Sequence, residues 1–213
     1  MILTSEGAAR DYCASLTDSA GLARLDRLAD LLRAENREQN LIAKASENIL
    51  WRRHFADSAQ LLFHVPRGTQ EGAAPWIDLG TGAGFPGLVI AALRPEIPTI
   101  LVESRRRRAE WLARAAASLD LRNCRIEAQR LENVESFAVA AISARAFAPL
   151  PKLLRLSARF STRDTVWLLP KGQSARQEIV ELPPAVRRMF HVEHSVTDEK
   201  AGILVGKGRP EIT

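Results

Sequence analysis

The stretch Asp78-Leu-Gly-Thr-Gly-Ala-Gly-Phe-Pro-Gly87 decides the fold of this chain. The apolar run that begins at Trp76 predicts a short buried strand before it, and the apolar residues 86–93 predict a helix after it. Glycines permit a tight turn with positive φ and let a ligand approach the backbone closely. The first N–H groups of the following helix are free and carry partial positive charge. The stretch therefore predicts a strand–loop–helix unit that binds a nucleotide-like cofactor.

An acidic residue follows the loop at the distance that a nucleoside site requires. Glu103 ends the β-branched run TILVE (99–103), which predicts the next strand. A carboxylate about 20 residues after a glycine loop can accept hydrogen bonds from both ribose hydroxyls of a nucleoside. We therefore expect Glu103 to lie beside the loop and to hold the ribose of a cofactor.

The glycine loop fits two sequence motifs. Gly82, Gly84 and Gly87 fit the dinucleotide motif G-x-G-x-x-G. Together, Asp78, Gly80, Gly82 and Gly84 fit D-x-G-x-G-x-G, the usual loop of S-adenosylmethionine-dependent methyltransferases. The local pattern does not separate the two, but the chain has no room for the extra catalytic domain that a dehydrogenase needs. The context therefore favours a methyltransferase, with a NAD-dependent oxidoreductase as the alternative.

The remainder of the chain predicts an α/β fold. Apolar, β-branched runs alternate with helical patterns, which is typical of βαβ units and a mostly parallel sheet with helices on both faces. We expect a Rossmann-like class I methyltransferase sheet of seven strands. The predicted strands are 76–80, 99–103, 124–128, 139–143, 165–169, 189–196 and 203–205, and the predicted helices are 86–93, 105–119 and 150–160.

Residues 1–65 predict helices alone. Leucines from Leu25 to Leu32 recur at helical spacing, and Gly21 is expected to separate this helix from an earlier one. A third helix is predicted from Ser46 to Phe63, with the Ser46 hydroxyl as its N-cap. Turn-forming residues from Pro66 to Pro75 indicate a linker. We expect residues 1–74 to form a helical extension packed on a methyltransferase domain of residues 75–213.

Composition restricts the class of protein. The chain has 213 residues, of which 46% are hydrophobic and 26% charged, a composition typical of soluble globular proteins and not of disordered or fibrous ones. The two isolated cysteines, Cys13 and Cys124, do not make a disulfide framework, which favours a reducing cytoplasm. The start of the chain lacks a signal-peptide pattern, and the longest uncharged run, residues 79–93, is too short to span a bilayer. We expect a cytoplasmic protein without membrane attachment.

The positive charge is concentrated in one part of the chain. The net charge is +5, yet residues 1–75 hold nine basic and ten acidic groups, whereas residues 101–163 hold 13 basic and six acidic groups. A basic segment next to a cofactor loop favours an anionic partner such as a nucleic acid. The 25 arginines against 5 lysines also have a simpler explanation, which is codon bias in a GC-rich genome.

Five motifs carry a resemblance that extends over most of the chain. They are the pair Asn40-Leu41, the helix Arg53-His-Phe-Ala-Asp-Ser58, the loop ending Phe85-Pro-Gly87, the segment Arg145-Ala-Phe-Ala148 and Lys171-Gly-Gln173. In this order they resemble the N-L-T, R-H-x-x-D-S, F-P-G, S-R-A-F-A and K-G-Q elements of the bacterial small-subunit (16S) ribosomal RNA guanine-N7 methyltransferases, the glucose-inhibited division protein B family. Ile42 and Ala144 depart from this pattern, where the family usually has Thr and Ser.

The resemblance implies methyl transfer from S-adenosylmethionine to N7 of a guanine in small-subunit ribosomal RNA, with S-adenosylhomocysteine as the product. Gly80 and Phe85 are then expected to contact the cofactor from the loop, Leu131 and Glu132 to frame its adenine, and Arg145 to face its pocket. The full set expected at the cofactor is Asp78, Gly80, Gly82, Gly84, Phe85, Glu103, Leu131, Glu132 and Arg145.

This reaction requires no general base, because guanine N7 has a free lone pair and a sulfonium methyl group is already activated. Catalysis can rest on positioning and electrostatics. Arg145 and Lys171 are candidates to orient the guanine by donating to its O6 atom. A phosphate contact or a surface ion pair is the alternative role for Lys171.

Ribosomal RNA, or a ribosomal assembly intermediate, is the expected partner of a monomeric protein. The candidate RNA contacts are His54, Arg105, Arg106, Arg107, Arg108, Arg130 and Lys171. Four consecutive arginines point in different directions around a helix, so a solvated helix face is the alternative for Arg105–Arg108. Helix capping or a hydrogen bond in the core is the alternative for His54.

Two further features are interpreted as structural. His191 and His194 lie three apart on a predicted strand and so face opposite sides, and we expect no metal site. The four tryptophans are expected in the core. The rival functions are methyl transfer to a small molecule or a protein on the same fold, NAD-dependent oxidation, and RNA binding without catalysis.

Overall fold

A seven-stranded sheet forms the centre of the computed structural model, which describes residues 2–65 and 74–211. The strand order is β3-β2-β1-β4-β5-β7-β6. Strands β1 to β5 are parallel to their neighbours, and β7 runs antiparallel to both β5 and β6. The mostly parallel α/β sheet predicted from the sequence is confirmed. Its strands are β1 (Trp76–Leu79), β2 (Thr99–Val102), β3 (Cys124–Glu127), β4 (Ala141–Ala144), β5 (Val166–Lys171), β6 (Phe190–His194) and β7 (Gly202–Lys207).

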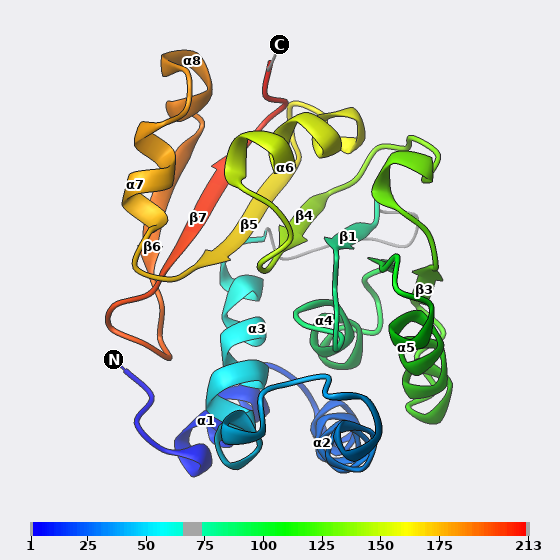
Figure 1. Ribbon diagram of the computed structural model, residues 1–213. Helices are drawn as coiled ribbons and strands as arrows, with labels where there is room; N and C mark the ends of the chain where they lie inside the picture. The colour runs from blue at the N-terminus through cyan, green and yellow to red at the C-terminus, as the bar shows by residue number, and fades with distance from the viewer. Residues whose placement is uncertain (1, 66–73, 212–213) are drawn as a thin grey trace.

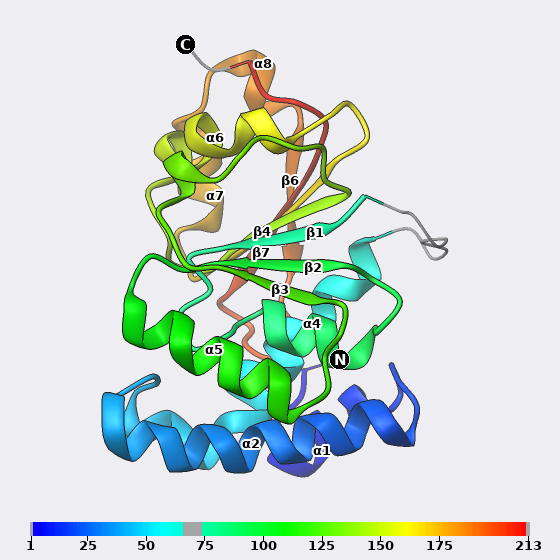
Figure 2. The ribbon, with the colours of Figure 1, turned by 90° about the vertical axis from the view of Figure 1, so that its right-hand side faces the viewer.

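Helices cover both faces of the sheet (Figure 1). On one face lie α4 (Gly87–Leu93) and α5 (Arg106–Ser118), and on the other lie α6 (Leu150–Ser157), α7 (Ala175–Val180) and α8 (Pro184–Arg187). The N-terminal helices α1 (Glu6–Ala14) and α2 (Ser19–Gln39) form a further layer beyond α4 and α5, as Figure 2 shows.

Each face of the sheet has its own hydrophobic core, because successive side chains of a strand point to opposite faces. Trp76 and Leu101 pack with leucines of α2 on one face, whereas Ile77 and Ile142 pack with α6 on the other. The N-terminal helices thus share a continuous core with the sheet. All four tryptophans are buried, as expected.

The segment predicted as one helix from Ser46 to Phe63 has a mixed geometry. It contains a 3₁₀ turn η1 (Lys44–Ile49), a π-helical turn η2 (Trp51–Ala56), the short α3 (Asp57–Ala59) and a 3₁₀ turn η3 (Gln60–His64). The N-cap prediction was wrong, because Ser46 lies inside η1 and its hydroxyl donates to the carbonyl oxygen of Ala43. Single π-helical turns are frequent at functional sites, and this one carries His54.

Two other local predictions need correction. Gly21 does not separate two helices, since it lies inside α2, and the break falls at residues 15–18. A Cβ atom at Gly21 would lie 1.9 Å from the Thr17 hydroxyl, so close packing explains the glycine. The fourth strand is β4 (Ala141–Ala144) rather than 139–143, because Val139 pairs with Phe160. Helices α7 and α8 were not predicted.

Most of the predicted linker from Pro66 to Pro75 lies outside the described residues. Within residues 2–65 and 74–211, no helix combines the length and the apolar character needed to cross a membrane.

Candidate cofactor and acceptor site

The site lies at the edge of the sheet where the parallel strands end. The carboxyl ends of parallel strands meet at one edge, and open α/β sheets bind ligands there. The loop after β1, Glu103 after β2, Arg145 after β4 and Lys171 at the end of β5 all lie at this edge. The sheet therefore collects residues that are far apart in the sequence.

The glycine loop adopts the backbone conformation that its composition predicts. Gly80, Gly82 and Gly84 have φ angles of +63°, +62° and +108°. A Cβ atom at Gly80 would lie 2.5 Å from the Phe147 ring, and one at Gly84 would lie 2.4 Å from Leu88. At Gly82, by contrast, the nearest atom to a Cβ would be 3.7 Å away. The loop is thus closely packed at Gly80 and Gly84 and has more free space at Gly82.

Asp78 supports the loop from inside the protein. Its carboxylate is fully buried and accepts hydrogen bonds from the Gly87 backbone N–H at 2.9 Å and the Ser143 hydroxyl at 2.7 Å. Ser143 in turn accepts a bond from Trp76 Nε1 at 2.8 Å. Burial raises the pKa of Asp78, and these hydrogen bonds oppose the rise. Asp78 therefore fixes the start of α4, and its direct contact with a cofactor stays a prediction.

Glu103 joins the loop to the start of α5. One carboxylate oxygen accepts from the Gly82 N–H at 3.1 Å and the other from the Arg105 N–H at 2.8 Å. The side chain is only 5% exposed. A carboxylate held in this position next to Gly82, where the loop has more free space, fits the expected ribose acceptor.

A cavity of about 310 Å³ opens beside the loop. Gly80, Leu131, Glu132 and Phe147 line it, with Leu131 buried and Glu132 exposed. The residues fit a nucleoside cofactor, because the Gly80 backbone, the Glu132 carboxylate and the apolar side chains of Leu131 and Phe147 come together. The sequence-predicted residues Gly80, Leu131 and Glu132 line this cavity, and Glu103 lies between two residues that line it, Val102 and Ser104. Arg145 lines a second cavity instead, and Phe85 stacks on His54.

A larger cavity of about 730 Å³ lies beyond the segment Arg145–Ala148. Arg145 and Ala146 line this cavity, and Phe147 and Ala148 line the smaller one, so the segment separates the two. Ala146 has a φ of +54°, which strains a residue with a Cβ atom. His54 and Lys171 also line the larger cavity. A methyl acceptor that entered this cavity would approach the cofactor cavity across the segment Arg145–Ala148.

His54 is buried at the wall of the larger cavity. Its ring stacks on Phe85, with 4.8 Å between the ring centroids, and its Nδ1 atom lies 3.0 Å from an Arg145 nitrogen. Burial, reinforced by the charges of Arg145 and Arg53, lowers the pKa of His54 to about 3. Its Nε2 atom is buried without a hydrogen-bond partner among the described residues. Because the ring is 6% exposed, direct contact with RNA stays a prediction.

Arg145 links His54 to the mostly buried carboxylate of Asp57. The guanidinium lies 3.5 Å from Asp57 Oδ2 and stands over the Phe85 ring, 5.3 Å from its centroid. Asp57 also accepts bonds from Thr197 at 2.9 Å and Gln60 at 3.0 Å. Burial raises the pKa of Asp57, and the charge of Arg145 opposes this most strongly. Asp57 belongs to the motif Arg53-His-Phe-Ala-Asp-Ser58, but its pairing with Arg145 was not predicted.

Lys171 forms an ion pair. Its Nζ atom lies 2.7 Å from Glu178 Oε2, and the two side chains are 12% and 22% exposed. The Ser174 hydroxyl donates to the other Glu178 oxygen at 2.9 Å. An ion pair was one of the roles considered for Lys171, but this pair lies in the cavity rather than at the surface. The sequence contains no local signal for Glu178.

The four arginines at the start of α5 point in different directions. Arg106 is 92% exposed and pairs with Glu110 at 2.8 Å, whereas Arg107 donates to the Glu38 carbonyl of α2 at 3.4 Å. Arg105 is exposed, and Arg108 is half-buried near Gly82. Arg130 is exposed at the rim of the smaller cavity. They do not form one surface, so RNA contact by each of them stays a prediction.

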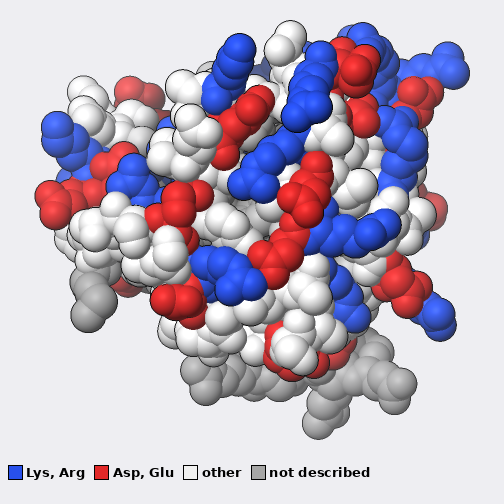
Figure 3. All heavy atoms as spheres, turned by 90° about the horizontal axis from the view of Figure 1, so that it is seen from below, with Lys and Arg blue, Asp and Glu red and all other residues white. Residues whose placement is uncertain are grey.

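The face seen from below mixes both signs of charge. In Figure 3 the blue and red side chains interleave on this face, which Figure 1 shows to be formed mainly by α1 and α2. This agrees with the slight acidic excess of residues 1–75. This face is therefore poorly suited to bind a polyanion.

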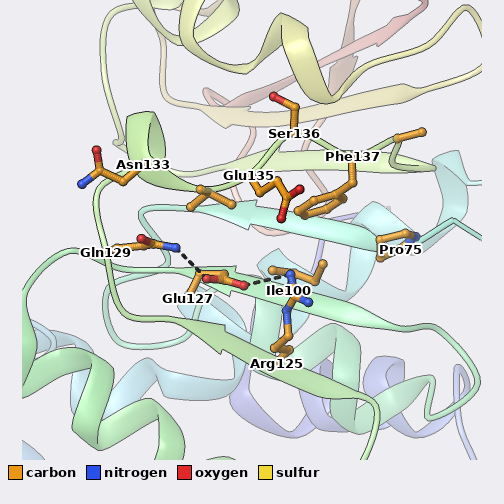
Figure 4. A pocket seen from close by; sticks show the side chains of 11 residues that line it. Pro75, Ile100, Arg125, Glu127, Gln129, Asn133, Glu135, Ser136 and Phe137 are labelled. Carbon is orange, nitrogen blue, oxygen red and sulfur yellow. Dashed lines mark hydrogen bonds and ion pairs between the residues drawn. The ribbon is translucent and has the colours of Figure 1, made fainter.

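Another hollow, of about 650 Å³, lies beside β3 (Figure 4). Two of its charged groups are paired with each other, since Glu127 lies 2.8 Å from Arg125, and Glu127 also accepts from Gln129 at 2.9 Å. It has no glycine loop, so we do not assign the cofactor to it. Across residues 2–65 and 74–211, no group of three His, Cys, Asp or Glu residues could hold a metal ion.

Known proteins match this chain over most of its length. The family model of the rRNA small subunit methyltransferase G family matches residues 22–202. The ribosomal RNA small subunit methyltransferase G of Erythrobacter litoralis is 54% identical over 208 residues, which is 98% of this chain and 99% of the relative. Its counterpart in Novosphingobium aromaticivorans is 59% identical over 190 residues, 89% of this chain and 82% of the relative.

Solved structures support the fold. The ribosomal protein L11 methylase of Lactobacillus delbrueckii subsp. bulgaricus has a TM-score of 0.53 at 13% identity, covering 71% of this chain and 78% of its own. This likeness and the seven-stranded sheet identify a class I methyltransferase fold. Together with the match over residues 22–202, the two relatives establish that the chain belongs to the rRNA small subunit methyltransferase G family.

Proposed function

We propose that this chain transfers a methyl group from S-adenosylmethionine to N7 of a guanine in small-subunit (16S) ribosomal RNA. The observation that carries the proposal is the placement of two cavities on either side of Arg145–Ala148, one beside the glycine loop and one beside His54 and Lys171. Membership of the family supports the choice of RNA as the acceptor, and the resemblance in the five motifs supports guanine N7.

The cofactor cavity fits the donor. When bound, S-adenosylmethionine supplies an activated methyl group on a sulfonium. The chain's own residues bind and orient it: Glu103 accepts from the ribose hydroxyls, the glycine loop lets the cofactor approach the backbone closely, and Leu131 and Glu132 flank the adenine. The proposed cofactor contacts are those predicted from the sequence, namely Asp78, Gly80, Gly82, Gly84, Phe85, Glu103, Leu131, Glu132 and Arg145.

The larger cavity fits the acceptor. Guanine N7 attacks with its own lone pair, so no residue needs to remove a proton before methyl transfer. Catalysis then consists of holding N7 in line with the methyl group. The guanine gains positive charge as it is methylated, and carboxylates near the cavity, Asp57 and Glu178, offset this charge. Arg145 and Lys171 are the candidates for orienting the base.

We also propose the partner and the setting. Arg105, Arg106, Arg107, Arg108 and Arg130 would contact phosphates around the cofactor cavity, and His54 and Lys171 would contact the RNA base. The substrate is ribosomal RNA or an assembly intermediate. We propose in addition that the protein is a cytoplasmic monomer without a metal ion. Residues 1–74 are proposed as a helical extension on a domain of residues 75–213, although His54 and Asp57 contribute to the site.

The experiment uses small-subunit RNA and small subunits from a strain that lacks the gene. The purified protein is incubated with methyl-labelled S-adenosylmethionine, and modified nucleotides are mapped by mass spectrometry. We expect one guanine of the small-subunit RNA to gain a methyl group, and we expect that group to be at N7. Label in protein or in small solutes, with none in small-subunit RNA, would contradict the proposal and favour the other methyltransferase classes.

A further inference from the structure

The Lys171–Glu178 pair is the feature of the larger cavity that the reaction itself does not explain. Methyl transfer to N7 needs neither an acid nor a base, yet a lysine and a glutamate line the acceptor cavity together. The distance from Lys171 Nζ to Glu178 Oε2 is 2.7 Å, and the two side chains are 12% and 22% exposed. The pair is thus mostly shielded from bulk solvent but open to the cavity, where a ligand could reach it.

The pair presents a donor followed by two acceptors. The ammonium group of Lys171 has three N–H donors, of which the carboxylate uses one. Each Glu178 oxygen accepts one bond in the structure, from Lys171 or from Ser174, and an ionised carboxylate has about four acceptor positions. The order along the pair is therefore N–H of Lys171, Oε2 of Glu178 and Oε1 of Glu178, with capacity left on each group.

This order complements the Watson–Crick edge of guanine. That edge presents O6 as an acceptor and then N1–H and N2–H as donors. We propose that Glu178 determines the specificity for guanine by accepting from N1–H and N2–H, while Lys171 donates to O6. The inference rests on the proposed function, because it assumes that a guanine enters this cavity with its N7 edge toward the cofactor.

The same contacts reject adenine. Adenine has an amino group where guanine has O6, and a lone pair where guanine has N1–H. In the same position it would place a donor against the Lys171 ammonium and a lone pair against the Glu178 carboxylate. A site with buried polar groups discriminates strongly when those groups would be left unpaired or opposed.

The carboxylate also responds to the charge that develops during transfer. N7 methylation makes the purine ring cationic and its N1–H more acidic, so a hydrogen bond from N1–H to a carboxylate becomes stronger in the transition state. An interaction that strengthens in the transition state raises kcat rather than lowering KM alone. The proposal therefore predicts that loss of the Glu178 charge acts mainly on kcat.

The test compares guanine with inosine, which lacks only the N2 amino group. Small-subunit RNA is assembled by splinted ligation with either base at the position that the wild-type protein methylates. The ligated RNA is supplied either free or within a small subunit, whichever form the wild-type protein methylates. Methyl transfer is measured for wild type, Glu178→Gln, Lys171→Met and the control Glu181→Gln, whose exposed side chain lies one residue beyond α7.

We expect wild type and Glu181→Gln to prefer guanine over inosine by at least tenfold in kcat/KM. Glu178→Gln should lower kcat on guanine at least tenfold and reduce the preference to less than threefold. Lys171→Met should lower activity on both bases but keep a preference for guanine, because the carboxylate remains. Circular dichroism of each variant shows whether it folds.

Two results overturn the inference. A preference that is equal in wild type and Glu178→Gln shows that the carboxylate does not contact the N2 amino group. If Glu178→Gln and Lys171→Met lower kcat/KM by the same factor as each other, and each does so equally on guanine and inosine, the pair acts only as a structural ion pair. If the wild-type protein methylates no small-subunit RNA in any form, the proposed function fails instead, so the two failures are distinguishable.

Discussion

The guanidinium group of Arg145 donates a hydrogen bond to Nδ1 of His54, with 3.0 Å between the two nitrogens. An arginine side chain has only donors, so Nδ1 must accept and the imidazole proton must be on Nε2. The contact joins the π-helical turn η2 to the end of β4. The N-terminal residues are therefore part of the acceptor cavity as well as a covering layer.

A change in pH tests the state of His54. Its pKa in the folded protein is about 3, below the ordinary 6.5. Between these values the unfolded chain binds a proton that the folded protein does not, so stability falls as the pH decreases. His54→Gln keeps an acceptor for Arg145 and does not titrate.

We expect wild type to lose about 2 kcal/mol more stability than His54→Gln between pH 7 and pH 5. Urea denaturation at both pH values measures this difference. His194→Gln is the control, because His194 is exposed on β6. Parallel losses in wild type and His54→Gln would show that His54 is protonated in the folded protein.

The pairing of Arg145 with Asp57 predicts a loss of stability whose pH dependence is opposite to that of His54. Arg145→Met leaves a mostly buried carboxylate without its cation, so we expect a loss of about 2–3 kcal/mol at pH 7. The loss should shrink at pH 5, because removal of the arginine raises the pKa of Asp57 further and the carboxyl then binds a proton. Chemical denaturation measures both values.

Arg114→Met is the matched control, because Arg114 pairs with Glu35 and is 56% exposed. A surface pair of this kind contributes less than about 1 kcal/mol. If Arg145→Met and Arg114→Met lowered the free energy of unfolding by the same amount, the Arg145–Asp57 contact would contribute no more than a surface ion pair does.

The glycine loop predicts how cofactor binding responds to a methyl side chain at Gly80. Gly80→Ala forces a residue with a Cβ atom into a φ of +63° and places that atom 2.5 Å from the Phe147 ring. The ring forms part of the cofactor cavity. We expect the Kd for S-adenosylmethionine to rise at least tenfold in calorimetric titration. Gly7→Ala, in α1, places its Cβ atom no closer than 4.0 Å to the Ser5 hydroxyl and should bind as wild type does. Wild-type affinity in a folded Gly80→Ala protein would refute the loop assignment.

Replacement of Glu103 tests the ribose contact. Glu103→Gln removes the charge and turns one of the two acceptors into a donor that faces a backbone N–H. Hydrogen bonds to charged groups contribute about 1.5–3 kcal/mol, so we expect the affinity for S-adenosylmethionine to fall about 10- to 100-fold. Glu110→Gln, which removes an exposed pair with Arg106, is the control. Equal affinities for the two variants would remove Glu103 from the site.

The sequence predicted the sheet and the loop because their signals are local. A strand, a glycine loop and an acid at a fixed distance follow from backbone conformation and strand length alone. The contacts of Asp57 and Glu178 could not be predicted in this way. Asp57 meets Arg145 only because η2 packs against the end of β4, and Glu178 meets Lys171 through a short helix without a clear periodic pattern.

The error at Ser46 has a related cause. A serine before an apolar segment is a good N-cap in an α-helix, but this segment begins as a 3₁₀ turn, where the hydroxyl donates to the carbonyl of Ala43 three residues earlier. Likewise, Gly21 suggested a break because its packing partner, Thr17, cannot be recognised without the structure. Local propensity therefore fails where tertiary packing decides the conformation.

The buried chain from Trp76 through Ser143 to Asp78 provides the last prediction. Ser143→Ala leaves two buried groups without a partner, the Trp76 Nε1–H and the Asp78 Oδ1 atom. Each unsatisfied buried group costs about 1–3 kcal/mol, so we expect a loss of about 3 kcal/mol in urea denaturation. Ser161→Ala is the control, because this buried hydroxyl only donates to a carbonyl within one turn. It should lose about 1 kcal/mol.

Since Asp78 also holds the Gly87 N–H at the start of α4, Ser143→Ala should weaken cofactor binding as well. An unchanged Kd for S-adenosylmethionine would show that Asp78 holds the loop without Ser143.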